Sequence, residues 1–181
     1  SWPPEDRVDG KLAIRRTRHD ATWSTEENRP PTYRTATTHW WDGSQLYGSS
    51  AERLACVRGS ATGGKIELTA DGLLPPDGDT GVDLTGFNDD YWVALSLLHH
   101  LFALEHNAIC DALRRENPHV DDDWIFEHAR LINSALLAKI HTVEWTPAIL
   151  SHPAVKRGMN AAWYGLLGRR FKRKFPNLHF G

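Results

Sequence analysis

Four residues near the start of the chain have the types and the spacing that could hold a hard metal cation. They are Thr38, Trp40, Asp42 and Ser44. Alternate residues of an extended segment point to the same side, so the set offers two hydroxyls, one backbone carbonyl and one carboxylate. Calcium prefers oxygen ligands of these kinds. The same residues also fit an ordinary Asp-Gly turn with a serine cap, and the spacing alone does not decide between the two interpretations.

His141 is a further candidate for chemistry. It lies within KIHTVEWT, late in a helix-like run. Ser134 and Arg130 lie about two and three turns earlier, on roughly the same side of a helix. A single histidine at such a position is nevertheless more often a core or surface residue than a ligand.

The remaining polar motifs favour structural roles. Three further histidines, which could suggest a metal cluster, have apolar residues where a metal site would need partners, so packing is the preferred interpretation. They are His99, His100 and His106. The basic segment RRFKRKF at 169–175 could contact phosphate or lipid headgroups, but a solvated face or a link between domains is preferred. We assign no catalytic residue from these patterns.

The segment 92–150 carries the strongest structural signal and must position these residues. Its first part is apolar nearly all round and continues to residue 115 without Gly or Pro, which predicts a long helix buried on most sides. Residues 88–90 offer this helix an N-cap, Pro118 ends it, and Asp121 caps a second one. We expect helices near 90–116 and 122–145, packed on each other. The first spans on the order of 38 Å, which suits the interior of a large domain.

The rest of the chain carries weaker signals. Residues 1–37 are polar and lack periodicity, which predicts a wrapping loop. Strand-like runs at 54–58 and 65–69 around a glycine-rich turn predict a small hairpin. Pro147 could begin a further turn, and residues 153–175 predict short helices. The expected fold is therefore mainly α, with long loops, as one piece of a single domain.

Composition narrows the classes of function. The chain has 21 Lys and Arg against 23 Asp and Glu, a net charge of −2, so no nucleic-acid partner is indicated. Cys56 and Cys110 do not lie in a metal-binding or disulfide pattern, which is compatible with a reducing compartment such as the cytoplasm. No apolar run suits a membrane span or a signal peptide.

Three blocks of the sequence resemble the animal-type haem peroxidases, a superfamily that includes the cyclooxygenases and the fatty-acid α-dioxygenases. The blocks are THWWDGSQLYGS at 38–49, LHHLFALEHNAICDALRRENP at 98–118 with IFEHARLINSALLAKIHTVEWTPAIL at 125–150, and MNAAWYGLLGRRFKRKF at 159–175. They follow one another in the order typical of the family. The last block and KIHTVEWT are most similar to the α-dioxygenase branch.

This resemblance implies a mainly α fold and a haem-dependent oxidoreductase. It implies haem b as a cofactor, calcium bound by the segment at 38–44, and a fatty-acid carboxylate held by His141 and Thr146. In the α-dioxygenases, peroxide-oxidised haem generates a tyrosyl radical, which removes a hydrogen next to the carboxylate, where O₂ then adds. The peroxidase branch instead uses hydrogen peroxide to oxidise small reductants, and this activity stays an alternative.

The resemblance has gaps that make the chain look like an internal fragment. The family's distal histidine motif, with a further calcium ligand, is expected before residue 38, and its proximal histidine and radical tyrosine are expected after residue 181. Neither is found. Asn88 stands where the peroxidase branch carries a catalytic arginine, which favours the α-dioxygenase branch. We expect the fragment alone to be inactive, and a haem-free helical piece that only binds partners is the remaining alternative.

Overall fold

The computed structural model describes residues 38–87 and 92–176, together with residues 7, 8, 11, 12, 20, 22, 30, 32 and 33. The chain divides into two compact units, Ser1–His39 and Trp40–Gly181. In the first unit, strand β1 (Arg7–Val8) pairs antiparallel with strand β2 (Lys11–Leu12). Most of the wrapping loop predicted at 1–37 lies outside the described residues.

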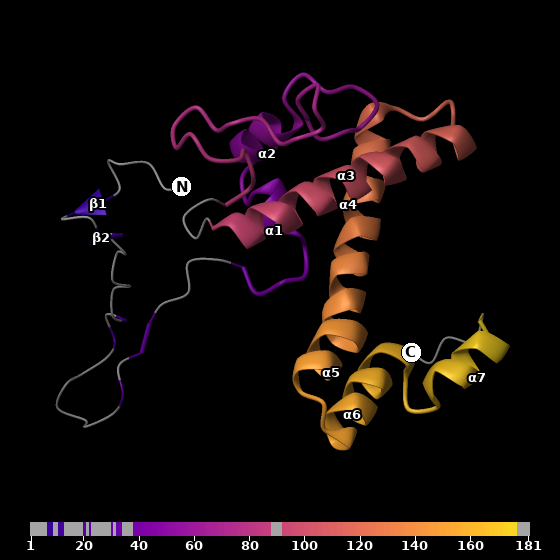
Figure 1. The fold of residues 1–181 in the computed structure, drawn as a ribbon. Coiled ribbons are helices and arrows are strands. Elements are labelled where there is room, and N and C mark those ends of the chain that lie inside the picture. Colours follow the sequence, from indigo (N-terminus) through magenta and orange to yellow (C-terminus); the bar gives the residue numbers. More distant parts are fainter. Residues whose placement is uncertain are drawn as a thin grey trace. The chain divides into compact units, whose positions relative to one another are not determined.

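The second unit is built mainly of helices (Figure 1). In chain order they are α1 (Ser44–Tyr47), α2 (Ala51–Arg58), α3 (Val93–Glu116), α4 (Asp122–Lys139), the π-helical turn η3 (Ile140–Trp145), α5 (Thr146–Ile149), α6 (Pro153–Tyr164) and α7 (Gly168–Lys174). The predicted mainly α fold is confirmed, including the short helices in the last part of the chain. Among the described residues, no helix is both long and apolar enough to cross a bilayer.

Helices α3 and α4 form the predicted pair and pack on each other (Figure 1). The carboxylate of Asp121 caps α4 by accepting a hydrogen bond from the backbone N–H of Trp124 at 2.6 Å, as predicted. Arg114 in the last turn of α3 pairs with Asp122 in the first turn of α4, which fastens the two helices across their connection. Residues 88–90, which were expected to cap α3, lie outside the described residues.

The core lies where α3 meets α4 and the segment before α3. Its larger cluster consists of Leu46, Tyr47, Val57, Ile66, Leu74, Ala103 and Phe126. A second cluster, between the two long helices, consists of Cys110, Ile125 and Ala129. Burial of each large apolar side chain contributes about 1.5–3 kcal/mol. The clusters therefore hold α1 and α2 firmly against the helix pair. Ser44, the first residue of α1, is one of the predicted cation ligands.

Helix α3 exposes a large apolar face, in contrast to the prediction that it is buried on most sides. The exposed apolar residues are Val93, Leu97, Leu98, Leu101 and Leu104. The buried side of the helix carries small or polar residues instead, namely His99, Ala103, His106 and Cys110. Within the described part of the chain, other elements pack against one side of α3 only, so the expected burial of its leucines is not found there.

The predicted hairpin is wrong. Its first run, 54–58, lies in helix α2, whose N-cap Ser50 accepts a hydrogen bond from a backbone N–H in the first turn at 3.2 Å. Leu54 and Val57 are three residues apart and both pack into the core, so the helical spacing prevails over the β-branched and apolar composition. The second run, 65–69, is not a strand either.

Gly86 lies so close to α1 that no side chain fits there. A Cβ atom at Gly86 would lie 2.0 Å from the backbone nitrogen of Gly48 and 2.1 Å from the carbonyl oxygen of Ser44. We expect Gly86→Ala to lower the free energy of unfolding by about 1–3 kcal/mol through overpacking, as measured by urea unfolding. Gly78→Ala is the matched control, because nothing lies within 4 Å of a Cβ atom there. Equal stability of the two variants would contradict this account.

Candidate functional site

The predicted carboxylate-binding pair lies where the helix changes type. Helix α4 passes into the π-turn η3 at Ile140, and the backbone N–H of Thr146 donates to the carbonyl of His141, which is an i→i+5 bond. In an α-helix, residues five apart point about 140° away from each other. The wider turn instead places the backbones of His141 and Thr146 one above the other. The structure therefore brings the two predicted residues together.

Pro147 explains why the helix changes type here. Proline has no N–H, and in an α-helix its ring collides with the carbonyl four residues earlier, so α4 cannot continue through it. Proline suits the first turn of a helix, and Pro147 occupies that place in α5. The turn expected at this proline is confirmed. The α-helix predicted to reach residue 145 ends at Lys139, because the six residues that follow form the π-turn.

The side chain of His141, in the second unit, is exposed to solvent and lies against an aromatic side chain. Its ring contacts the indole of Trp41, with ring centroids 4.8 Å apart and ring planes at 56°. Thr146 is half-buried. The hydroxyl of Ser134, two turns earlier in α4, is buried and has no hydrogen-bond partner among the described residues. An exposed imidazole beside an indole, with a threonine in the next turn, suits a ligand that has an anionic head and an apolar chain.

Trp41 also connects this pair to the predicted cation segment. It directly precedes Asp42, the carboxylate of that segment. The next residue, Gly43, is buried, and a Cβ atom there would lie 3.2 Å from the hydroxyl of Ser134 in α4. The segment therefore packs tightly against the helix that leads to His141. Trp41 was not predicted as a site residue, although its place between two predicted cation ligands in THWWDGS was a usable signal.

The cation segment forms a turn at Asp42. One carboxylate oxygen of Asp42 accepts a hydrogen bond from the backbone N–H of Ser44 at 3.0 Å, in the manner of an Asx turn. Trp40, Asp42 and Ser44 lie in the second unit, whereas Thr38 belongs to the first and is half-buried there. Among the described residues, no cluster of three or more His, Cys, Asp or Glu could hold a metal ion. A cation here would therefore depend on Asp42 and on neutral oxygens.

His106 is buried in a directed hydrogen-bond network. Its Nε2 lies 3.0 Å from the carbonyl of Gly64, and its Nδ1 lies 3.0 Å from the hydroxyl of Tyr47. Because a carbonyl can only accept, Nε2 carries the proton and the Tyr47 hydroxyl donates to Nδ1. Asn133 in turn donates to the Tyr47 hydroxyl at 2.8 Å. Burial lowers the pKa of His106 to about 4, so the ring is neutral, and the predicted packing role is confirmed for this histidine.

A haem group needs an apolar crevice and an axial side-chain ligand. The exposed leucines of α3 offer an apolar wall of the kind that a macrocycle requires. Both ring nitrogens of the buried His106 are already bonded to protein partners, so this histidine does not fit the axial position. The exposed leucines of α3 are thus suited to one apolar wall of a haem site, whereas His106 is not its axial ligand.

Comparison with known proteins decides the family. The sequence matches the family model described as animal haem peroxidase over residues 2–179. The chain belongs to the animal haem peroxidase family. It is 47% identical over 141 residues to alpha-dioxygenase PIOX from Nicotiana tabacum, and 43% identical over 139 residues to alpha-dioxygenase 1 from Arabidopsis thaliana. These matches cover 78% and 76% of the chain but 22% and 21% of the relatives, so the chain spans about a fifth of their length.

Solved structures agree with the sequence comparisons. The fatty acid alpha-dioxygenase of Oryza sativa matches with a TM-score of 0.74 at 39% identity, covering 82% of this chain and 24% of that one. A variant of it, solved with palmitic acid, matches with a TM-score of 0.72 at 40% identity and the same coverage. The predicted resemblance to this enzyme family and to its α-dioxygenase branch is confirmed. Membership of the family implies haem as the cofactor.

Proposed function

We propose that the complete protein is a haem-dependent fatty-acid α-dioxygenase. The observation that carries the proposal is the 47% identity to an α-dioxygenase over 141 residues, which cover 78% of this chain. A related structure contains palmitic acid, which supports a long-chain fatty acid as the substrate class. Molecular oxygen would be the second substrate, and peroxide would activate the cofactor.

In this proposal His141 and Thr146 hold the carboxylate of the fatty acid. The imidazole supplies an N–H donor and the threonine supplies a hydroxyl, while Trp41 restricts the imidazole ring by direct contact. The reacting carbon is bonded to the carboxylate carbon, so a fixed carboxylate also fixes the position of the reacting carbon. Haem, when bound, supplies the oxidising power for removal of a hydrogen atom from that carbon.

A calcium ion held by the segment at 38–44 is the second part of the proposal. Asp42 would be the anionic ligand, and the hydroxyls of Thr38 and Ser44 with the carbonyl of Trp40 would be neutral ligands. The Asx turn uses one carboxylate oxygen of Asp42, and the other oxygen can still accept from or bind a further group. A cation there would hold the segment, and with it Trp41, in place beside His141.

We expect Asp42→Asn to abolish calcium retention by the complete protein. Asparagine keeps an oxygen that can accept the N–H of Ser44, but only neutral oxygens then face the divalent ion. The metal content is measured by mass spectrometry after dialysis against trace calcium. Asp71→Asn, at an exposed Asp-Gly turn elsewhere, is the control and should leave the calcium content unchanged. Equal calcium content in the two variants would show that Asp42 is not a calcium ligand.

Oxygen uptake by the haem-loaded complete protein tests the proposed activity. We expect uptake with palmitic acid and none with hexadecanol, which has the same chain length but no carboxylate. Peroxide-dependent oxidation of small reductants without uptake on palmitic acid would favour the peroxidase alternative. Absence of a haem absorption band from the complete protein as it is purified, before any haem is added, would favour the haem-free binding alternative.

A further inference from the structure

Charge is distributed very unevenly along the chain. All 23 aspartates and glutamates precede residue 145, whereas seven of the 21 lysines and arginines follow residue 150. Five of these seven lie in helix α7, namely Arg169, Arg170, Lys172, Arg173 and Lys174. All five are exposed, and none of the ion pairs found among the described residues involves them. Helix α7 is therefore an uncompensated cationic surface on a chain that is slightly acidic as a whole.

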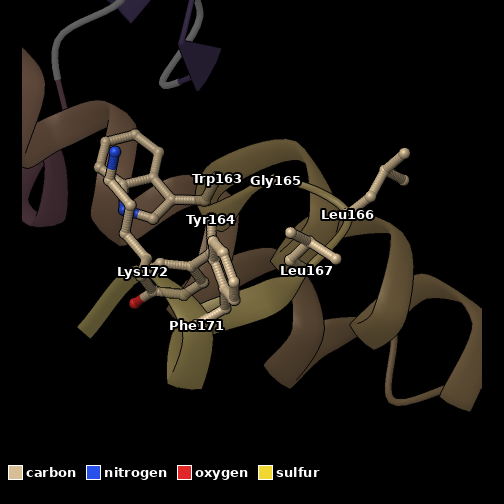
Figure 2. Close-up of a pocket in the computed structure, with 7 residues that line it drawn as sticks. All are labelled: Trp163, Tyr164, Gly165, Leu166, Leu167, Phe171 and Lys172. Atoms are coloured by element: carbon tan, nitrogen blue, oxygen red, sulfur yellow. The ribbon is translucent and has the colours of Figure 1, made fainter. Parts of the chain in front are cut away.

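An apolar turn stands next to these cations. Helices α6 and α7 are joined by a turn in which Leu166 is 95% exposed and Leu167 is 59% exposed. Gly165 and Gly168 flank the two leucines with φ of 79° and 76°, backbone conformations that favour glycine. Figure 2 shows Leu166 pointing away from the aromatic side chains beside it. The turn therefore exposes the apolar side chains of Leu166 and Leu167 to solvent at its tip.

Aromatic side chains behind the turn line a cavity (Figure 2). It has a volume of about 510 Å³, and Trp163, Tyr164, Phe171 and Lys172 contribute to its lining. The guanidinium of Arg169 lies over the Tyr164 ring, 5.9 Å from its centroid. Aromatic rings, leucines and cations within one short segment are the composition of protein elements that lie in a membrane interface.

We propose that the basic hairpin, residues 163–174, docks on the surface of an anionic lipid bilayer. Leu166, Leu167 and Trp163 would enter the interfacial layer, and the cations of α7 would meet the negative headgroups. A solvated helix, the interpretation preferred from the sequence, accounts for the cations but not for two adjacent exposed leucines at the tip. An anionic surface with an apolar layer beneath it matches both features. The inference is independent of the proposed oxidation.

Vesicle co-sedimentation of the complete protein tests the inference. One set of vesicles is pure phosphatidylcholine, and the other contains phosphatidylcholine and phosphatidylserine in equal parts. We expect binding to the second set only, with weakening at high salt because the headgroup contacts are screened. Arg170→Gln with Arg173→Gln should weaken that binding about 30-fold, given the contribution of each cation near a charged membrane.

Two further double variants make the outcome decisive. Leu166→Ser with Leu167→Ser should also weaken binding while all charges are kept, and circular dichroism verifies that the helices persist. Lys65→Gln with Arg115→Gln removes equal charge from outside the hairpin and should leave binding unchanged. The inference is overturned if the protein does not bind the anionic vesicles, if the cation variant binds like the parent, or if the hairpin variants change the oligomeric state and not vesicle binding.

Discussion

Replacement of His141 by alanine is expected to lower the affinity of the complete protein for fatty acids about 10- to 150-fold. The variant removes a charge-assisted hydrogen bond to the carboxylate, which contributes roughly 1.5–3 kcal/mol, and about 1.4 kcal/mol corresponds to a factor of ten. Oxidation of a small donor without a carboxylate should barely change. The measurement is the dissociation constant for palmitic acid, together with the rate of small-donor oxidation.

His128→Ala is the matched control for this prediction. His128 also belongs to α4, where its ring stacks on Trp124 with centroids 3.6 Å apart, and it lies about 20 Å further along the helix from His141. The control should leave fatty-acid affinity unchanged. If His141→Ala lowered both activities together, the histidine would have a structural role. If it altered neither, the assignment of the carboxylate site would be wrong.

Acidification from about pH 6.5 to about pH 4 is expected to remove roughly 3 kcal/mol of stability through His106 alone. Burial lowers the pKa of His106 to about 4 in the folded protein, whereas the unfolded chain has the ordinary value of about 6.5. Between these pH values the unfolded state binds more protons than the folded state. The free energy of unfolding therefore decreases as the pH is lowered. The contribution is fully present above pH 6.5.

The variant His106→Gln isolates this effect from other titrating groups. Glutamine keeps polar atoms in the network but does not titrate. The free energy of unfolding of both proteins is measured by urea denaturation across the acidic range. The difference between them should shrink steadily as the pH falls below 6.5, because only the histidine protein loses this contribution. Parallel curves would assign the acid sensitivity to other residues.

The long helices could be predicted from the sequence because their signals are local and agree with one another. Uninterrupted apolar residues, Pro118 and the Asp121 cap all indicate the same boundaries for α3 and α4. Helix α2 was mistaken for a strand because a run of eight residues is too short for periodicity to outweigh composition. Its helical state depends on the Ser50 cap and on packing of Leu54 and Val57 into the core, which is a tertiary effect.

The residues of the candidate site are a prediction from the sequence, whereas their geometry could not be predicted from it. His141 and Thr146 came from the family motif, whereas an α-helical period would have placed them on different sides. The π-turn that aligns them follows from Pro147 only once the hydrogen bonds are known. The Trp41–His141 contact joins residues 100 positions apart, and neither side chain carries a local signal for its partner.

The π-turn gives this segment a particular response to changes in length. Such a turn is equivalent to an α-helix that has gained one residue. Deletion of Val143 alone would place Thr146 four residues after His141, so that an ordinary α-type hydrogen bond could join the same two backbones. The same deletion within the regular turns of α4 would instead rotate every later residue by about 100° around the helix axis. The π-turn is therefore the place in this stretch where the chain can lose one residue and keep the relative orientation of what precedes and follows it.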